Sequence, residues 1–189
     1  MADNKSTPCS YQFGSFKADN DPNMSLTISV YMGSLVLCVF MKGPPCRFTV
    51  PRSAVSMLKK TITNTINGQP GQKTSFDFIK WDPETKKQEP IGNLVVGKDD
   101  KGMIYFGVTA PSMPPTKFTI KAPLGIDTSE PMSDVDRSLL GAETLIEQLA
   151  HDIPMAILMT TQKKEPNSSG YKKAPYGQPY GRPAPSTPW

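Results

Sequence analysis

Basic residues stand beside large aromatic ones at two places in this sequence. Lys17 follows Phe16, and Lys80 precedes Trp81. An aromatic ring can stack on a nucleic-acid base while a neighbouring lysine contacts a phosphate, and neither interaction requires a particular base sequence. These two pairs therefore favour the binding of an extended, negatively charged chain.

Both pairs belong to a unit that occurs twice. In each copy, segments with β-type alternation precede a segment with the apolar spacing of a helix. Strands are expected to open at 10–16 and 75–81 and to close at 44–50 and 114–120, with helices from about 51 to 66 and from about 133 to 153. The sequence thus predicts an α+β fold of two tandem β-β-β-β-α repeats, with antiparallel sheets and packed helices. Chance convergence of two β patterns is the alternative to a duplicated unit.

The faces of the opening strands decide what their aromatic residues can do. Strand side chains alternate between the two faces, so Phe16 is expected on the face opposite to Tyr11 and Phe13. Trp81 is out of phase with its own apolar neighbours in the same way. Both rings are then expected on the polar faces. A neighbouring loop or subunit that covers them is the alternative interpretation.

The remaining strands carry further aromatic and basic residues on their expected polar faces. Tyr31 and Tyr105 alternate with apolar residues, and Arg47 in the first closing strand corresponds to Lys117 in the second, with Lys121 following. A charge in such a position is also typical of an ordinary solvated strand. The two copies therefore match in the residues that they turn outward as well as in their apolar pattern.

Composition and charge divide the chain. Twenty prolines and fourteen glycines among 189 residues favour short strands between turns. The predicted divisions are a flexible N-terminus (1–9), a first repeat (10–71), a second repeat (72–161) and a disordered tail (162–189). Counting Lys and Arg against Asp and Glu gives 15 − 9 = +6 for 1–126, 1 − 7 = −6 for 127–152 and 5 − 1 = +4 for 153–189. This asymmetry indicates a surface for a polyanion beside a segment that repels it or meets another partner.

The second helix and the tail each allow two interpretations. Apolar residues from Val135 to Ile153 follow a helical stripe that packs in the core or on another protomer, and Pro154 is expected to kink or end the helix. The tail repeats Pro-Tyr-Gly and cannot bury enough apolar surface to offset its ordering entropy. It is either a solubilising linker or an additional contact for a single strand. Trp189 at its end is a candidate for docking by another protein.

The sequence lacks the usual signatures of catalysis and metal binding. Cys9, Cys38 and Cys46 form no CxxC pair, His151 is the one histidine, and no phosphate-binding glycine loop or nucleophile elbow is present. We therefore expect no enzyme activity, no cofactor and no metal. The apolar runs are far shorter than the roughly 20 residues of a membrane-spanning helix, and the N-terminus has no apolar signal core. A cytoplasmic protein without membrane contact is the expectation.

Duplicated strand-helix units with basic and aromatic residues on a sheet face resemble the Whirly and positive-cofactor type of single-stranded DNA-binding fold. The resemblance covers about 10–153 and is architectural. Length, compact body and Tyr/Gly/Pro tail are also similar to phage single-stranded DNA-binding proteins of the podovirus Drc type, which act in replication and transcription in the host cytoplasm. Many replication-type binders end in an acidic tail, whereas this tail is basic.

The resulting hypothesis is sequence-tolerant binding of single-stranded DNA by a homo-oligomer, with a polymerase or another replication protein as a candidate partner. RNA is an alternative ligand, because no residue pattern reads a 2′-hydroxyl. The residues expected to contact phosphates are Lys17, Arg47, Lys80, Lys117 and Lys121. The residues expected to stack on bases are Phe16, Tyr31, Trp81 and Tyr105. Further contacts are expected from the tail residues Tyr171, Lys172, Lys173, Tyr176, Tyr180 and Arg182. Two other classes stay open: an interaction or transcription adaptor that uses the acidic helix and Trp189, and an oligomeric structural protein.

Overall fold

The computed structural model describes residues 10–82, 84–122 and 131–162, except for the side chains of Trp81, Asp82 and Gln162. In chain order its elements are β1 (Ser10–Lys17), β2 (Ser25–Tyr31), β3 (Ser34–Phe40), β4 (Cys46–Val50), α1 (Arg52–Ile66), β5 (Lys73–Asp82), β6 (Lys87–Lys98), β7 (Ile104–Ala110), β8 (Met113–Thr119), α2 (Asp134–Glu147), η1 (Gln148–Asp152) and α3 (Ile153–Gln162). The predicted tail contacts, Tyr171, Lys172, Lys173, Tyr176, Tyr180 and Arg182, lie outside the described residues.

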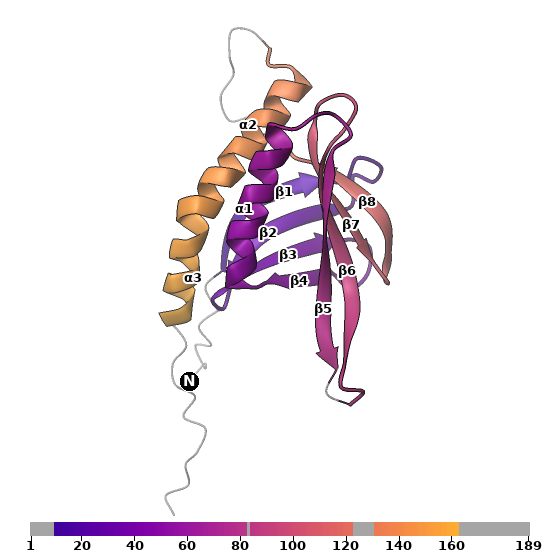
Figure 1. Cartoon of the computed structure of the whole chain (residues 1–189), viewed down its shortest axis with the longest axis vertical. Helices are drawn as coiled ribbons and strands as arrows, with labels where there is room; N and C mark the ends of the chain where they lie inside the picture. Colours follow the sequence, from indigo (N-terminus) through magenta and orange to yellow (C-terminus); the bar gives the residue numbers. More distant parts are fainter. Residues whose placement is uncertain (1–9, 83, 123–130, 163–189) are drawn as a thin grey trace, which may run out of the picture.

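Each repeat forms its own antiparallel sheet. The strands follow one another in chain order, β1-β2-β3-β4 in sheet 1 and β5-β6-β7-β8 in sheet 2. A helix follows each sheet, α1 after β4 and α2 after β8, as Figure 1 shows. The predicted α+β class with two β-β-β-β-α units is therefore confirmed.

The inner faces of the two sheets meet in one core that the helices close. Phe16 of β1 packs near Phe106 of β7 with ring centroids 6.1 Å apart, and Phe48 of β4 stacks on Phe78 of β5 at 4.7 Å. The helix α1 contacts both sheets, while α2 contacts β7 and α3 contacts β1, β2 and β3. Both repeats thus contribute to a shared apolar interior, and their outer faces point away from it.

The second helix runs on past the proline that was expected to kink or end it. Ser133 caps α2 by accepting a hydrogen bond from the Asp136 N–H at 3.1 Å. Immediately before Pro154, η1 widens into a π-helical turn in which the Ile153 N–H donates to the Gln148 carbonyl. A wider turn accommodates a ring that lacks an N–H and would otherwise collide with the preceding turn. Of the two expected outcomes, the end of the helix at Pro154 is therefore wrong, because α3 extends to Gln162.

A β-bulge in β1 overturns the predicted face of Phe16. Gln12 pairs with Ser29, but Gly14 pairs with the next residue, Ile28, so Phe13 is the extra residue of the bulge. Beyond this point the inward and outward positions are exchanged. Phe16 consequently turns into the core and is 8% exposed. Its assignment as an exposed stacking residue is wrong.

The edge strands β1 and β8 join at one end of the molecule. Ala18 and Phe118 form an antiparallel bridge, and the Asp19 N–H donates to the Lys117 carbonyl at 2.9 Å. Because both side chains of the bridge are buried, the residues on either side of it belong to the outer surface. The outer faces of the two sheets therefore meet at this junction. None of the helices in the described part of the chain is both long and apolar enough to cross a membrane.

Candidate nucleic-acid interface

The outer face of sheet 1 carries exposed rings and charges on a floor of short side chains. Residues paired across antiparallel strands project from the same face. One outward row joins Lys17, Ser25 and Phe40, and the next joins Ser15, Thr27, Cys38 and Arg47. Tyr31 lies further along β2 on the same face. We call this surface, with Lys17, Tyr31, Phe40 and Arg47 around its small central residues, the sheet 1 outer face.

Its aromatic residues are accessible. Tyr31 is 40% exposed and Phe40 is 46% exposed. They occupy opposite ends of the hairpin, because Tyr31 pairs with Ser34 next to the turn and Phe40 pairs with Ser25 at the far end. Phe40 lies six residue steps along β3 from Ser34, so the face extends about 20 Å along the strands. This length suits several nucleotides of an extended single strand.

Its basic residues are available to a ligand. Lys17 in β1 and Arg47 in β4 are exposed and stand on opposite edges of the sheet. Within the described part of the chain neither takes part in any of the ion pairs. Two uncompensated cations that flank accessible rings can attract a phosphate chain across the sheet.

On sheet 2, Tyr105 lies across the backbone of β6. A side chain added at Gly97 would place its Cβ 2.6 Å from Cζ and Oη of Tyr105. The ring therefore occupies the space that the glycine leaves free. The Lys117 ammonium lies 5.0 Å from the ring centroid. A shallow hollow of about 240 Å³ adjoins this ring and includes Lys73 and Pro115 in its lining.

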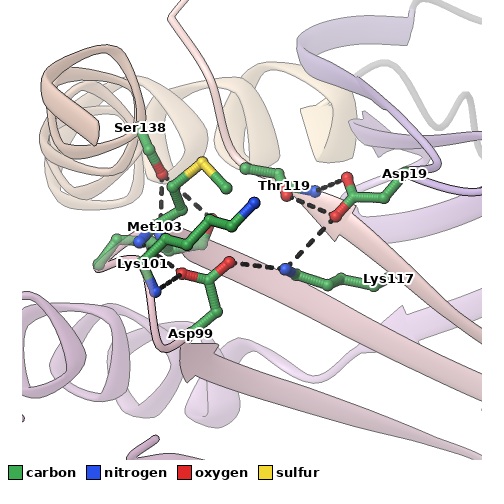
Figure 2. Close-up of polar contacts among 8 residues, drawn as sticks. Asp19, Asp99, Lys101, Met103, Lys117, Thr119 and Ser138 are labelled. Carbon is green, nitrogen blue, oxygen red and sulfur yellow. Dashed lines mark hydrogen bonds and ion pairs between the residues drawn. The ribbon is translucent and has the colours of Figure 1, made fainter. Parts of the chain in front are cut away.

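The ammonium group of Lys117 forms ion pairs within the protein (Figure 2). Its Nζ lies 2.7 Å from the Asp99 carboxylate and 3.4 Å from that of Asp19. Asp19 in turn accepts hydrogen bonds from the Thr119 N–H and hydroxyl, at 3.1 and 2.8 Å. Asp99 also accepts from the N–H groups of Lys101 and Met103. Lys117 therefore positions the β6–β7 tip and the β1–β8 junction, and its charge is not available to a phosphate, contrary to the sequence-based prediction.

This network shifts two protonation equilibria in opposite directions. Burial acts to raise the pKa of Asp99, but the hydrogen bonds from Lys117, Met103 and Lys101 and the charge of Lys117 together lower it. Burial acts to lower the pKa of Lys117, but its bonds to Asp99 and Asp19 and their charges raise it. Both shifts favour the charged forms, so the ion pair persists over a wide pH range.

No family model and no curated protein matches this chain.

The other predicted residues lie at separate places. Lys80 is exposed near the far end of β5, where its backbone pairs with Glu89, and Trp81 pairs with Gln88. Figure 1 shows this end of the β5–β6 hairpin extending beyond the body of the molecule. Lys121, which follows β8, forms an ion pair of 3.0 Å with Asp134. The structure thus brings Lys17, Tyr31 and Arg47 onto one face, while the remaining predicted residues do not join them there.

Sequence reasoning missed Phe40. The run from Leu35 to Met41 is apolar at nearly every position, so nothing in it distinguishes an outward phenylalanine from an inward one. Pairing with Ser25 and exposure at the end of β3 identify it. His151 is exposed on η1, 3.6 Å from Glu147, and among the described residues there is no cluster of three metal-ligating side chains.

Proposed function

We propose that this protein binds single-stranded DNA with little sequence preference through the outer faces of its sheets. The sheet 1 outer face carries the proposal, because it presents Tyr31 and Phe40 to solvent between the uncompensated charges of Lys17 and Arg47. Stacking and phosphate contacts of this kind do not depend on base identity. The short side chain of the half-buried Ser25 leaves room for a strand to approach the sheet beside Phe40, while Thr27 and Cys38 in the next row are buried.

Further residues extend the proposed path. The exposed Lys73 and the half-buried Tyr105 offer a second area on sheet 2, and Lys80 and Trp81 add the β5–β6 hairpin. The tyrosines and basic residues of the tail make additional contacts with the single strand. A cytoplasmic location and a polymerase or another replication protein as partner belong to the same proposal. RNA is the competing ligand, and the binding assay includes it.

The contributions of stacking and of phosphate contacts to the affinity can be estimated. Each base stacked on an aromatic side chain contributes about 1–3 kcal/mol. Each phosphate contact to a single strand changes the slope of log affinity against log salt by about 0.7. The affinity should therefore fall steeply between low and physiological salt, and duplex DNA should bind more weakly because its bases cannot stack on the rings.

The test is a mobility-shift titration with single-stranded DNA, duplex DNA and RNA of equal length at two salt concentrations. Phe40→Ala and Tyr31→Ala are the variants, and Met57→Ala, an exposed residue of α1, is the matched control. Weaker binding of single-stranded DNA by the first two variants, with the control unchanged, supports the proposal. Tighter binding of RNA than of single-stranded DNA would identify RNA as the ligand.

We call the helices α1, α2, η1 and α3 the helical layer. Self-association of the protein through this layer is part of the proposal. Met155, Leu158 and Met159 of α3 are each at least half exposed. Leu158 also lines an apolar groove of about 400 Å³ between α1 and the residues of η1 and α3. Exposed apolar residues gathered on one face are typical of interaction sites.

The occupant that fits this face is a second copy of the chain. The helix α1 contains Arg52, Lys59 and Lys60 and no acidic residue. The neighbouring α2 and η1 contain five acidic residues and Arg137 as their one Lys or Arg. In a two-fold dimer the same patch serves both partners, so the basic helix of one copy can face the acidic helix of the other. Such a dimer leaves the sheet 1 outer faces accessible on both sides.

A further inference from the structure

A cavity lies at the junction where β1 meets β8. It has a volume of about 340 Å³, and its lining includes Lys17, Lys121 and Arg137. These three cations come from three segments: the end of β1, the residues after β8 and the second turn of α2. The fold thus assembles a group of positive charges from positions far apart in the sequence.

Arg137 is fixed in place but incompletely bonded. Its Nη2 donates to the Ala122 carbonyl at 3.4 Å, and its Nη1 lies 3.9 Å from the Asp134 carboxylate. Its backbone carbonyl accepts from the Ala122 N–H at 2.9 Å. In contrast, its Nε is buried and has no hydrogen-bond partner among the described residues. A buried, charged donor without a partner is unfavourable, and a turn of the guanidinium towards an anion in the cavity would satisfy it.

The carboxylates nearby do not cancel the positive charge of the cavity. Asp19 lines it, but Asp19 is already bonded to Thr119 and Lys117. Asp134 offsets one positive charge, that of Lys121, at 3.0 Å. Counted with Lys117, the four cations around the cavity exceed the three carboxylates Asp19, Asp99 and Asp134 by one positive charge, and Lys17 takes part in none of these ion pairs. An oxyanion with several acceptor oxygens matches both a lysine and the guanidinium donors.

We propose that this cavity binds a phosphate group, with Arg137 and Lys17 as its principal ligands. The position of the cavity in the fold indicates which molecule carries this phosphate group. Lys17 belongs to the sheet 1 outer face, and Thr119 and Lys121 continue the outer face of sheet 2. Resting on the proposed function, we assign the phosphate to the backbone of a single strand that passes from one sheet to the other. Free phosphate shares this chemistry and is the second arm of the test.

The test follows the side-chain Nε–H resonance of Arg137 by NMR in the full-length protein. The resonance is assigned by its loss in Arg137→Lys. Arg52 on α1, whose Nη2 donates to Thr161, is the matched control arginine. Inorganic phosphate and an oligothymidylate of about 12 nucleotides are titrated separately. A saturable shift of the Arg137 signal with the Arg52 signal unchanged supports the site. No shift with either probe, or equal and unsaturable shifts of both arginines, would overturn it.

Oligonucleotide affinities separate this site from the proposed function. Arg137→Met should weaken oligothymidylate binding several-fold and lower the salt slope by about 0.7. If Phe40→Ala weakens binding while Arg137→Met changes neither quantity, the cavity assignment fails and the sheet assignment stands. If inorganic phosphate shifts the Arg137 signal but the oligonucleotide does not bind, the cavity binds phosphate and the proposed function fails. Lys121→Met covers the case in which Arg137→Met does not fold, because Lys121 lines the cavity and lies outside the sheet 1 outer face.

Discussion

Phe16 and Phe106 face each other across the core, with ring centroids 6.1 Å apart and ring planes inclined at 52°. This contact joins the first strand of one repeat to the third strand of the other. It identifies Phe16 as a residue that stabilises the fold and separates it from the exposed aromatic residues of the same sheet.

Replacing Phe16 by alanine should lower the free energy of unfolding by about 3–5 kcal/mol, because it leaves a cavity between the sheets. Phe40→Ala should change the free energy of unfolding by less than about 1 kcal/mol, because that ring is 46% exposed. Urea unfolding of both variants measures the difference. Equal stabilities of the two variants would contradict the inward placement of Phe16.

The sequence predicts most of the fold because its repeats keep the periodicity of strands and helices. The closing strands illustrate this: Phe48 and Phe118 are buried, and Arg47 is exposed, as their alternation requires. Phe16 escapes the same reasoning because a single extra residue at Phe13 exchanges the faces beyond it. In sheet 2 the extra residue is Ile91 on the partner strand, so β5 keeps its phase.

The candidate site is less predictable than the fold because it depends on contacts between repeats. Lys117 has the outward position that alternation predicts, yet its charge is neutralised by Asp19 from the other repeat and by Asp99 at the neighbouring hairpin tip. No local pattern reveals either partner. Arg137 becomes a candidate ligand only because α2 lies beside the β1–β8 junction.

The ion pair of Asp99 and Lys117 makes a pH-dependent contribution to stability. Because the pKa of Asp99 is lowered on folding, its contribution is present above the unfolded pKa of about 4 and is lost as pH falls through the folded pKa. Asp99→Asn should lower the free energy of unfolding by about 1–3 kcal/mol at pH 7. This difference from the wild type should shrink below about pH 4. Urea unfolding at several pH values measures it.

Asp100→Asn is the control for this prediction, because Asp100 is the exposed neighbour of Asp99. It should follow the wild type at every pH. Since the pKa of Lys117 is raised on folding, the contribution of the pair is also lost at alkaline pH, above the unfolded pKa of lysine near about 10.4. A destabilisation by Asp99→Asn that is the same at pH 7 and at low pH would refute the role of this ion pair.

Gly97 should be required for the position of Tyr105. A valine there has no room, because its Cβ alone would meet the ring at 2.6 Å. If Tyr105 stacks on a base, Gly97→Val and Tyr105→Ala should each weaken single-stranded DNA binding by about 5- to 150-fold. The double variant should bind like either single variant, because both remove the same contact. Additive losses would show that the two residues act separately.

Self-association should depend on the helical layer. Leu158→Glu and Met155→Glu place a charge on the exposed apolar face of α3 and should convert the dimer into a monomer, because burying an unpaired carboxylate is costly. Ser15→Glu on the sheet 1 outer face is the control and should leave the dimer intact. Light scattering coupled to size-exclusion chromatography measures the mass. A wild-type monomer, or an unchanged dimer in both α3 variants, would refute this interface.

The most direct measurement of the central claim is the affinity of the wild type and of Phe40→Ala for a fluorescent single-stranded oligonucleotide, by anisotropy at two salt concentrations. Met57→Ala and circular dichroism control for changes away from the sheet 1 outer face. We expect salt-sensitive binding by the wild type that Phe40→Ala weakens by about 5- to 150-fold while its fold is intact. No binding at low salt, or equal affinities of the wild type and Phe40→Ala, would contradict the assignment of this face to single-stranded DNA.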